Sequence, residues 1–265
     1  MKHKLGILAG CIGGEDTLDT LVRIKKAGFD TVHVGRPDID RSVEIKKAAD
    51  DLGLETEFIH GEFKSINDMW ADDDSTPEIF LQLKHAIDMA QRSGIPAVIT
   101  HVSSGWNPPQ ICDKGLKRFD ELVDYAEAHG VIIALENLRK IGNISYLVDR
   151  YEHRDSVRYC YDSGHEYAYT RFVSFPDIFR EKLIYTHIHD NLGYEHNPDD
   201  PDLHLLPFDG NFNYRDMMKR LHKYNYQGSI MLEVASNWCN GKYANISPDD
   251  FLRTCYKRAK KISKM

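Results

Sequence analysis

Short apolar runs alternate with longer amphipathic segments along the whole chain. Several of these runs are hydrophobic at nearly every position, which is typical of strands that are covered on both faces in a parallel sheet. Eight runs rich in Val, Ile, Leu and aromatic residues are found at 4–10, 31–35, 55–61, 97–103, 131–137, 157–164, 183–190 and 229–235. The pattern therefore predicts eight strands.

Apolar residues at helical spacing predict helices in the segments between these strands. Two early segments, 17–28 and 41–53, end in a glycine that stops the helix. The segment 76–94 begins with Thr76 as a cap and a proline at the first helical position. Further helices are expected at 115–130, 214–228 and 247–262, with weaker ones at 143–151 and 174–182.

Eight strand–helix units in regular succession predict an α/β fold, a (β/α)8 TIM barrel. No linker or low-complexity segment interrupts them, so we expect a single domain of residues 1–265. A doubly wound open sheet is the alternative. The glycines in GILAGCIGGED lack the G-x-G-x-x-G spacing that would favour such a sheet, so the barrel is the better prediction.

Composition narrows the possible partners and the compartment. The chain has 34 Lys and Arg against 41 Asp and Glu, a net charge of −7, which disfavours nucleic acid as a partner. Its five cysteines are odd in number and form no C-x-x-C motif, so no disulfide framework is indicated. The apolar run near the start is too short for a signal peptide, and no window would span a membrane. We expect a cytoplasmic protein.

Most of the predicted strands have a polar residue at their C-terminal end. In a TIM barrel the groups that carry function project from the C-terminal ends of strands. Each residue alone could be a core histidine, a turn cap or an ion-pair partner, but an apolar run such as VIIAL does not cheaply end in a buried acid without a cation. The joint pattern predicts one shared site at His60, His101, Glu136, Asp162 with His165, His187 with His189, and Glu233.

Carboxylates and imidazoles without thiolates are ligands for Mn²⁺, Mg²⁺, Co²⁺ or Zn²⁺. Glu136, Asp162, His187 and Glu233 come from four consecutive predicted strands. Neighbouring strand ends lie close enough to chelate one divalent ion and leave positions open for substrate.

At these residues the chain resembles the xylose isomerase-like barrel superfamily. That superfamily includes sugar and sugar phosphate isomerases and epimerases and the apurinic endonucleases. The matching pieces are ALEN, YDSGH, HIHDN followed by DLHLLPFDG, and LEV, in the expected order. The resemblance covers the whole barrel and implies one divalent metal ion held by Glu136, Asp162, His187 and Glu233.

Similarity to the ketose 3-epimerases implies that Glu136 and Glu233 are catalytic. One glutamate removes the proton beside the carbonyl and the other returns it, with the metal stabilising the enediolate. We therefore expect a metal-dependent isomerase or epimerase of a small sugar, sugar phosphate or related keto-polyol, and dehydration is also open. His165 resembles a substrate-orienting residue, and His189 is expected above His187, touching substrate.

The endonuclease branch of the superfamily implies further ligands and a multi-zinc cluster. His60, His101 and Trp106 are also candidate substrate contacts. Two other functions stay open: a zinc-dependent apurinic endonuclease-type phosphodiesterase and a barrel that binds a ligand or metal without turnover. We expect a small-molecule sugar partner and no membrane, and a homo-oligomer stays open. The additional cluster ligands would be His60, His101, His165, Asp202 and His204.

Two departures from the superfamily pattern concern the substrate pocket. His33 stands in GFDTVHVG where many relatives have an acid, and LPFDGNFNY replaces their glycine-rich turn. The loop after HIHDN is also longer and more acidic than usual. An enzyme that acts on DNA would also need rim cations to bind phosphates. Few are available here, and the main candidates are Arg36, Lys64, Arg139 and Lys140.

Overall fold

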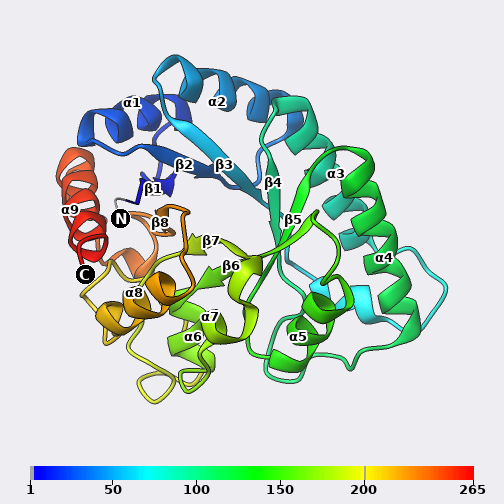
Figure 1. Ribbon diagram of the computed structural model, residues 1–265. Helices are drawn as coiled ribbons and strands as arrows, with labels where there is room; N and C mark the ends of the chain where they lie inside the picture. Colours follow the sequence, from blue (N-terminus) through cyan, green and yellow to red (C-terminus); the bar gives the residue numbers. More distant parts are fainter. Residues whose placement is uncertain (1–2, 200) are drawn as a thin grey trace.

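A ring of parallel strands surrounded by helices forms the protein, as a computed structural model of residues 3–199 and 201–265 describes it (Figure 1). The strand order β7-β6-β5-β4-β3-β2-β1-β8 is that of a TIM barrel, so the predicted fold is confirmed. All eight predicted strands are present: β1 (Leu5–Leu8), β2 (Thr31–Val34), β3 (Glu55–His60), β4 (Ala97–Thr100), β5 (Ile132–Glu136), β6 (Val157–Asp162), β7 (Leu183–His187) and β8 (Ile230–Leu232).

The barrel closes between β7 and β8 just beyond the end of β7. The backbone N–H of Ile188 donates to the carbonyl of Met231 at 2.8 Å, and the N–H of Glu233 donates to the carbonyl of Ile188 at 3.1 Å. These bonds bring the last strand ends together, including that of the predicted ligand Glu233.

Helices cover the outside of the ring, as Figure 1 shows. None of the helices in the described ranges is long and apolar enough to cross a bilayer. The α-helices are α1 (Thr17–Ala27), α2 (Ile39–Asp51), α3 (Glu78–Ser93), α4 (Asp113–Ala128), α5 (Ile141–Arg150), α6 (Ser163–Tyr169), α7 (Phe175–Phe179), α8 (Tyr214–Lys223) and α9 (Pro248–Ile262). Short 3₁₀ turns are η1 (Ile66–Trp70), η2 (Arg180–Lys182) and η3 (Cys239–Gly241).

The helix ends follow the local sequence signals at most positions. Asp16 caps α1 by accepting from the N–H of Leu18, and Gly28 ends it with φ 104°, a left-handed conformation that glycine adopts without strain. Ser247 caps α9 by accepting from the N–H of Asp250. The prediction at α3 is shifted: Pro77 occupies the capping position and the helix begins at Glu78.

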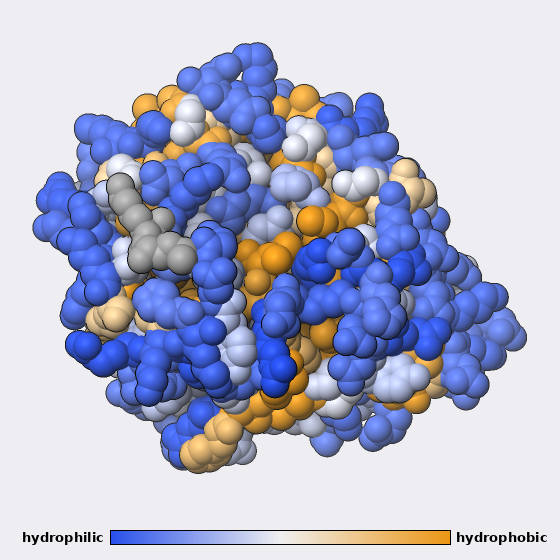
Figure 2. All heavy atoms as spheres, in the orientation of Figure 1, coloured by the Kyte–Doolittle hydropathy of each residue, from blue (hydrophilic) through white to orange (hydrophobic). Residues whose placement is uncertain are grey.

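An apolar layer fills the barrel directly beneath the polar strand ends. Side chains two apart on a strand share a face, so each apolar residue lies one layer below the polar residue that follows it by two. The stacked pairs are Phe58 under His60, Ile99 under His101, Ala134 under Glu136, Cys160 under Asp162 and Met231 under Glu233. In contrast to this interior, the outer surface over the helices is mostly hydrophilic (Figure 2).

Candidate metal centre

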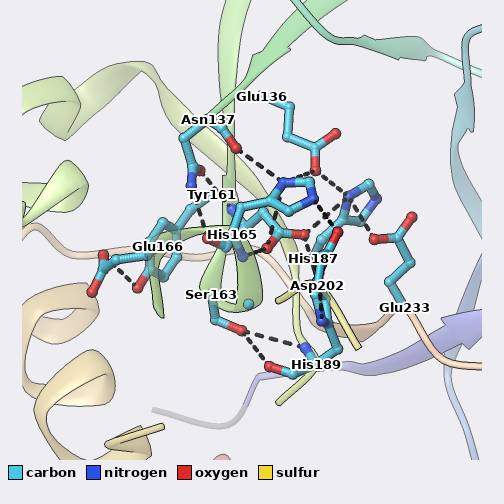
Figure 3. A network of polar contacts seen from close by, with 12 residues as sticks. Glu136, Asn137, Tyr161, Ser163, His165, Glu166, His187, His189, Asp202 and Glu233 are labelled. Carbon is cyan, nitrogen blue, oxygen red and sulfur yellow. Dashed lines mark hydrogen bonds and ion pairs between the residues drawn. The ribbon is translucent and has the colours of Figure 1, made fainter. Parts of the chain in front are cut away.

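Four buried side chains converge where β5, β6, β7 and β8 end (Figure 3). The ligand atoms of Glu136, Asp162, His187 and Glu233 all lie within 4.8 Å of one another. His187 Nδ1 lies 3.2 Å from Glu136 Oε1, 3.5 Å from Glu233 Oε2 and 3.9 Å from Asp162 Oδ2. The four residues predicted as metal ligands are therefore in contact around a common point.

The charges at this point fit a divalent cation. Burial lowers the pKa of His187, but the carboxylates of Glu233 and Glu136 outweigh it and raise that pKa to about 9. Burial raises the pKa of Glu233, but His187 and the second imidazole, His204, bring it down to about 2. Glu136 Oε2 is buried without a hydrogen-bond partner among the described residues. Buried carboxylates held this close together need a positive charge between them.

Two further histidines face the second oxygen of Glu136. His101 Nε2 lies 3.2 Å and His60 Nε2 lies 3.5 Å from Glu136 Oε2. His60, His101 and Glu136 thus form a second group whose ligand atoms lie within 4.8 Å of one another. Each oxygen of Glu136 therefore faces a different group of imidazoles.

A third group lies beside the first and uses a loop residue pair. Asp202 Oδ2 is 3.1 Å from His165 Nε2 and 3.3 Å from His204 Nε2. His189 also belongs to this group of four. Burial would raise the pKa of Asp202, but His204 and His165 hold it well below its usual value. The additional ligands implied by the resemblance are therefore gathered in space.

The loop that carries Asp202 and His204 is fastened at its base by Asp190. The Asp190 carboxylate accepts from the backbone N–H of Phe208 at 2.8 Å and of Phe212 at 3.0 Å. A Cβ at Gly210 would lie 2.3 Å from Asp190 Oδ1, so only glycine permits this approach. Asp190 consequently fixes the backbone of residues 208–212 beside the end of β7.

Helix α6 holds His165 in place, and the sequence pattern did not reveal it. Asp162 caps the helix by accepting from the N–H of His165 at 2.5 Å. Asn137 fixes Asp162 from the neighbouring strand, because its side chain donates to the Asp162 carbonyl at 2.9 Å and accepts from the Asp162 N–H at 2.8 Å. The position of Asn137, directly after Glu136 in ALEN, was the available signal.

A buried ion pair supports the outer side of α6. Arg220 of α8 donates to Glu166 Oε1 at 2.9 Å and to Oε2 at 3.1 Å. The hydroxyl of Tyr161 donates to the same carboxylate at 2.8 Å (Figure 3). These contacts anchor the helix next to His165.

A cavity of about 380 Å³ opens over the three groups. Its size is at the lower end of the roughly 300–1,000 Å³ range of small-molecule sites. A wider hollow of about 600 Å³ near α6 and α8 contains none of the predicted ligands. The predicted site residues that line the cavity are His60, His101, Glu136, His165, Asp202, His204 and Glu233.

Two predicted substrate contacts lie outside this cavity lining. His189 is fully buried behind it, with Nε2 3.1 Å from Asp162 Oδ2 and its ring stacked on His204 at 3.8 Å. It packs there because Gly164 leaves room, since a Cβ at that glycine would lie 2.0 Å from the ring. Trp106 is 47% exposed and packs on the rim against Tyr194.

His33 is a buried imidazole of the cavity wall. It is 1% exposed, and neither ring nitrogen has a hydrogen-bond partner among residues 3–199 and 201–265. Its ring centre lies 5.2 Å from that of His187. Burial lowers the pKa of His33 to about 3, so the ring is neutral and can offer one donor and one acceptor to a ligand.

The family follows from comparison with known proteins. Residues 21–255 match the family model described as Xylose isomerase-like TIM barrel, and the chain belongs to this family. The uncharacterised protein y4fM of Sinorhizobium fredii is 33% identical over 166 residues, 57% of this chain and 51% of that protein. The chain spans about half the length of the curated relatives it matches.

Among solved structures with the same fold, one is named as similar to a sugar epimerase and another is named as a sugar epimerase. A D-tagatose 3-epimerase-like protein has a TM-score of 0.71 at 20% identity and covers 98% of both chains. A D-psicose 3-epimerase, solved in the presence of D-fructose, has a TM-score of 0.71 at 17% identity with the same coverage. At these identities the likeness establishes the fold.

Proposed function

We propose that the protein is a divalent-metal-dependent isomerase or epimerase of a small sugar, sugar phosphate or related keto-polyol. The observation that carries this proposal is the pair of glutamates at the cavity floor. Glu136 and Glu233 come from β5 and from the end of β8, and each lies within 3.5 Å of His187 Nδ1. Two carboxylates beside one cation site suit the removal and return of a carbon-bound proton.

Glu136, Asp162, His187 and Glu233 would hold the metal. When bound, the cation supplies positive charge that offsets the charge developing on the substrate oxygens. Glu233 is ionised at neutral pH, because nearby imidazoles lower its pKa to about 2, and its exposed edge lines the cavity. It would accept the proton from the carbon beside the carbonyl and release it to solvent, and Glu136 would pass a proton taken from solvent to the carbon from the other side.

His165 would orient the substrate in this scheme. It lines the cavity, and α6 together with the Asp162 cap fixes its backbone. The two solved structures compared above bear the names of sugar epimerases or similarity to them, which supports a sugar as the substrate. The small cavity supports a ligand of monosaccharide size.

Exchange of a carbon-bound proton with solvent tests the proposal. Metal-loaded protein would be incubated in deuterium oxide with ketoses and ketose phosphates and followed by NMR. We expect deuterium to enter beside the carbonyl of at least one compound, and Glu233→Gln to abolish that exchange while ligand binding persists. Normal exchange in Glu233→Gln would refute the acid–base assignment, and no exchange with any compound would refute the function.

Phosphoester hydrolysis is a second candidate, favoured by the three contiguous ligand groups. Glu136 is shared by two of them, and Asp202 with His204 completes the third. Side chains for three ions are more than one proton-transfer reaction requires. Metal analysis separates the two functions: about one exchangeable ion per chain favours the isomerase, and three tightly held zincs favour the hydrolase. The net charge of −7 argues against nucleic acid as its substrate.

A further inference from the structure

Arg139 is a cation of the cavity wall that aromatic rings hold in place. It lies three residues after Glu136, so the two Cα atoms are at most about 11 Å apart. Its guanidinium carbon is 3.6 Å from the ring centre of Tyr169 and 4.8 Å from that of Trp106. Its Nε is buried and has no hydrogen-bond partner among residues 3–199 and 201–265.

This mode of support leaves the donors of Arg139 available. Aromatic faces attract a guanidinium through its charge and plane, without accepting its N–H groups in line. Two other arginines with little exposure use their donors within the protein: Arg118 donates to backbone carbonyls, and Arg220 donates to Glu166. A buried donor without an acceptor costs about 1–3 kcal/mol, so an acceptor from a ligand is expected at Arg139.

A second arginine lines the same cavity three strands away around the barrel. Arg36 follows β2, and its guanidinium carbon lies 4.5 Å from the ring centre of Phe63. Arg36 Nε also forms an ion pair with Glu62 Oε2 at 3.8 Å, a distance too long for a hydrogen bond. Two cations on aromatic rings therefore face one small opening.

We propose that the substrate carries a phosphate monoester, which Arg139 binds at the cavity mouth with Arg36 as the second cation. The inference rests on the proposed function and specifies its substrate class. A guanidinium fork matches two phosphate oxygens, and two fixed cations suit a dianion. The reacting end of the molecule would then lie over Glu136, and the spacing along the chain limits the ligand to a short sugar phosphate.

A long nucleic acid fits these observations less well. Affinity for a polymer comes from many cations spread along a face, whereas Arg36 and Arg139 surround a single cavity in a chain of net charge −7. A small ligand needs only this pair.

Binding to matched ligand pairs tests the inference. Calorimetry on the metal-loaded protein would compare ketopentoses and ketohexoses with the same sugars carrying a terminal phosphate. We expect at least one phosphorylated compound to bind more tightly than its partner, and Arg139→Gln to reduce that preference by roughly 10- to 100-fold, the usual range for a lost hydrogen bond to a charged group. Affinity for the unphosphorylated sugar should stay the same.

The matched control is Arg158→Gln. Arg158 is a partly buried arginine near the start of β6, at the other end of the barrel, and it pairs with Asp155 at 2.8 Å. We expect it to retain the full preference for phosphate. Arg139→Lys should retain part of it, because one point charge remains without the fork.

Failure of this inference can be told from failure of the proposed function. If no phosphorylated sugar binds more tightly than its partner, or if Arg139→Gln keeps the preference, the phosphate subsite is wrong even where neutral ketoses exchange deuterium. Tighter binding of sugar carboxylates or of a short DNA duplex would also overturn it. A preference that depends on Arg139, with no exchange in any compound, would support the subsite and reject the isomerase.

Discussion

Replacing Glu136 with glutamine should weaken metal binding at both ligand groups that share this carboxylate. Glu136 is 0% exposed, and its two oxygens face two different ligand groups. A four-ligand zinc site contributes an apparent ~10–16 kcal/mol, so an equal share is about 3 kcal/mol per ligand, or roughly 150-fold in affinity. Because Glu136 is common to both groups, Glu136→Gln should weaken an ion held by either group by this amount, whereas Asp202→Asn should leave the ion held with Asp162, His187 and Glu233 unchanged.

The assay is metal content by mass spectrometry after dialysis, followed by titration with a chelator of known affinity. Glu57→Gln is the matched control, because Glu57 is a buried barrel carboxylate that accepts from Thr31 and Ser229 at 2.8 Å and belongs to none of the groups found in the described residues. It should keep the full complement of ions. Unchanged metal content and affinity in Glu136→Gln would show that these side chains do not share cations.

Three other outcomes follow from buried contacts near the site. Arg220→Met should destabilise the protein by about 3–5 kcal/mol in urea unfolding, since Glu166 is left as an unpaired buried charge, and the double variant with Glu166→Gln should recover part of this loss. In the metal-free protein, prepared with a chelator, the pKa of His187 is about 9 when folded, against 6.5 as the ordinary value. Protonated His187 therefore stabilises the fold fully below pH 6.5, and thermal melts should show this stability decrease as the pH rises towards 9. Gly164→Ala should cost about 1–3 kcal/mol in urea unfolding because its Cβ collides with the ring of His189.

The barrel was predictable because its strands are continuously apolar and its helices carry recognisable ends. Period-two geometry on a strand also explains why the polar ends could be assigned to one rim: Glu136 follows Ala134, and Glu233 follows Met231 on the same inward face. The sequence pattern therefore identified the four side chains that the structure brings together at the strand ends.

Features that depend on packing could not be read from the pattern. Helix α6 is only seven residues long, too short to display helical spacing, so the Asp162 cap resembled a turn. His189 was expected to touch substrate because it lies two residues after His187, but its ring is fully buried and stacks on the ring of His204 at 3.8 Å. The role of Arg139 likewise depends on the rings of Tyr169 and Trp106, which are distant in sequence.

Because Asp190 fastens the loop after β7, the candidate ligands on this loop are structurally separate from those on the strands. Asp202 and His204 lie on a segment whose ends are pinned by Asp190, while Asp162 and His187 are part of the strands themselves. Exchanging the segment between these pins would alter how many ions the centre accommodates without disturbing the strand ligands. Descendants of such a scaffold could thus move between single-ion and multi-ion chemistry by changing one loop.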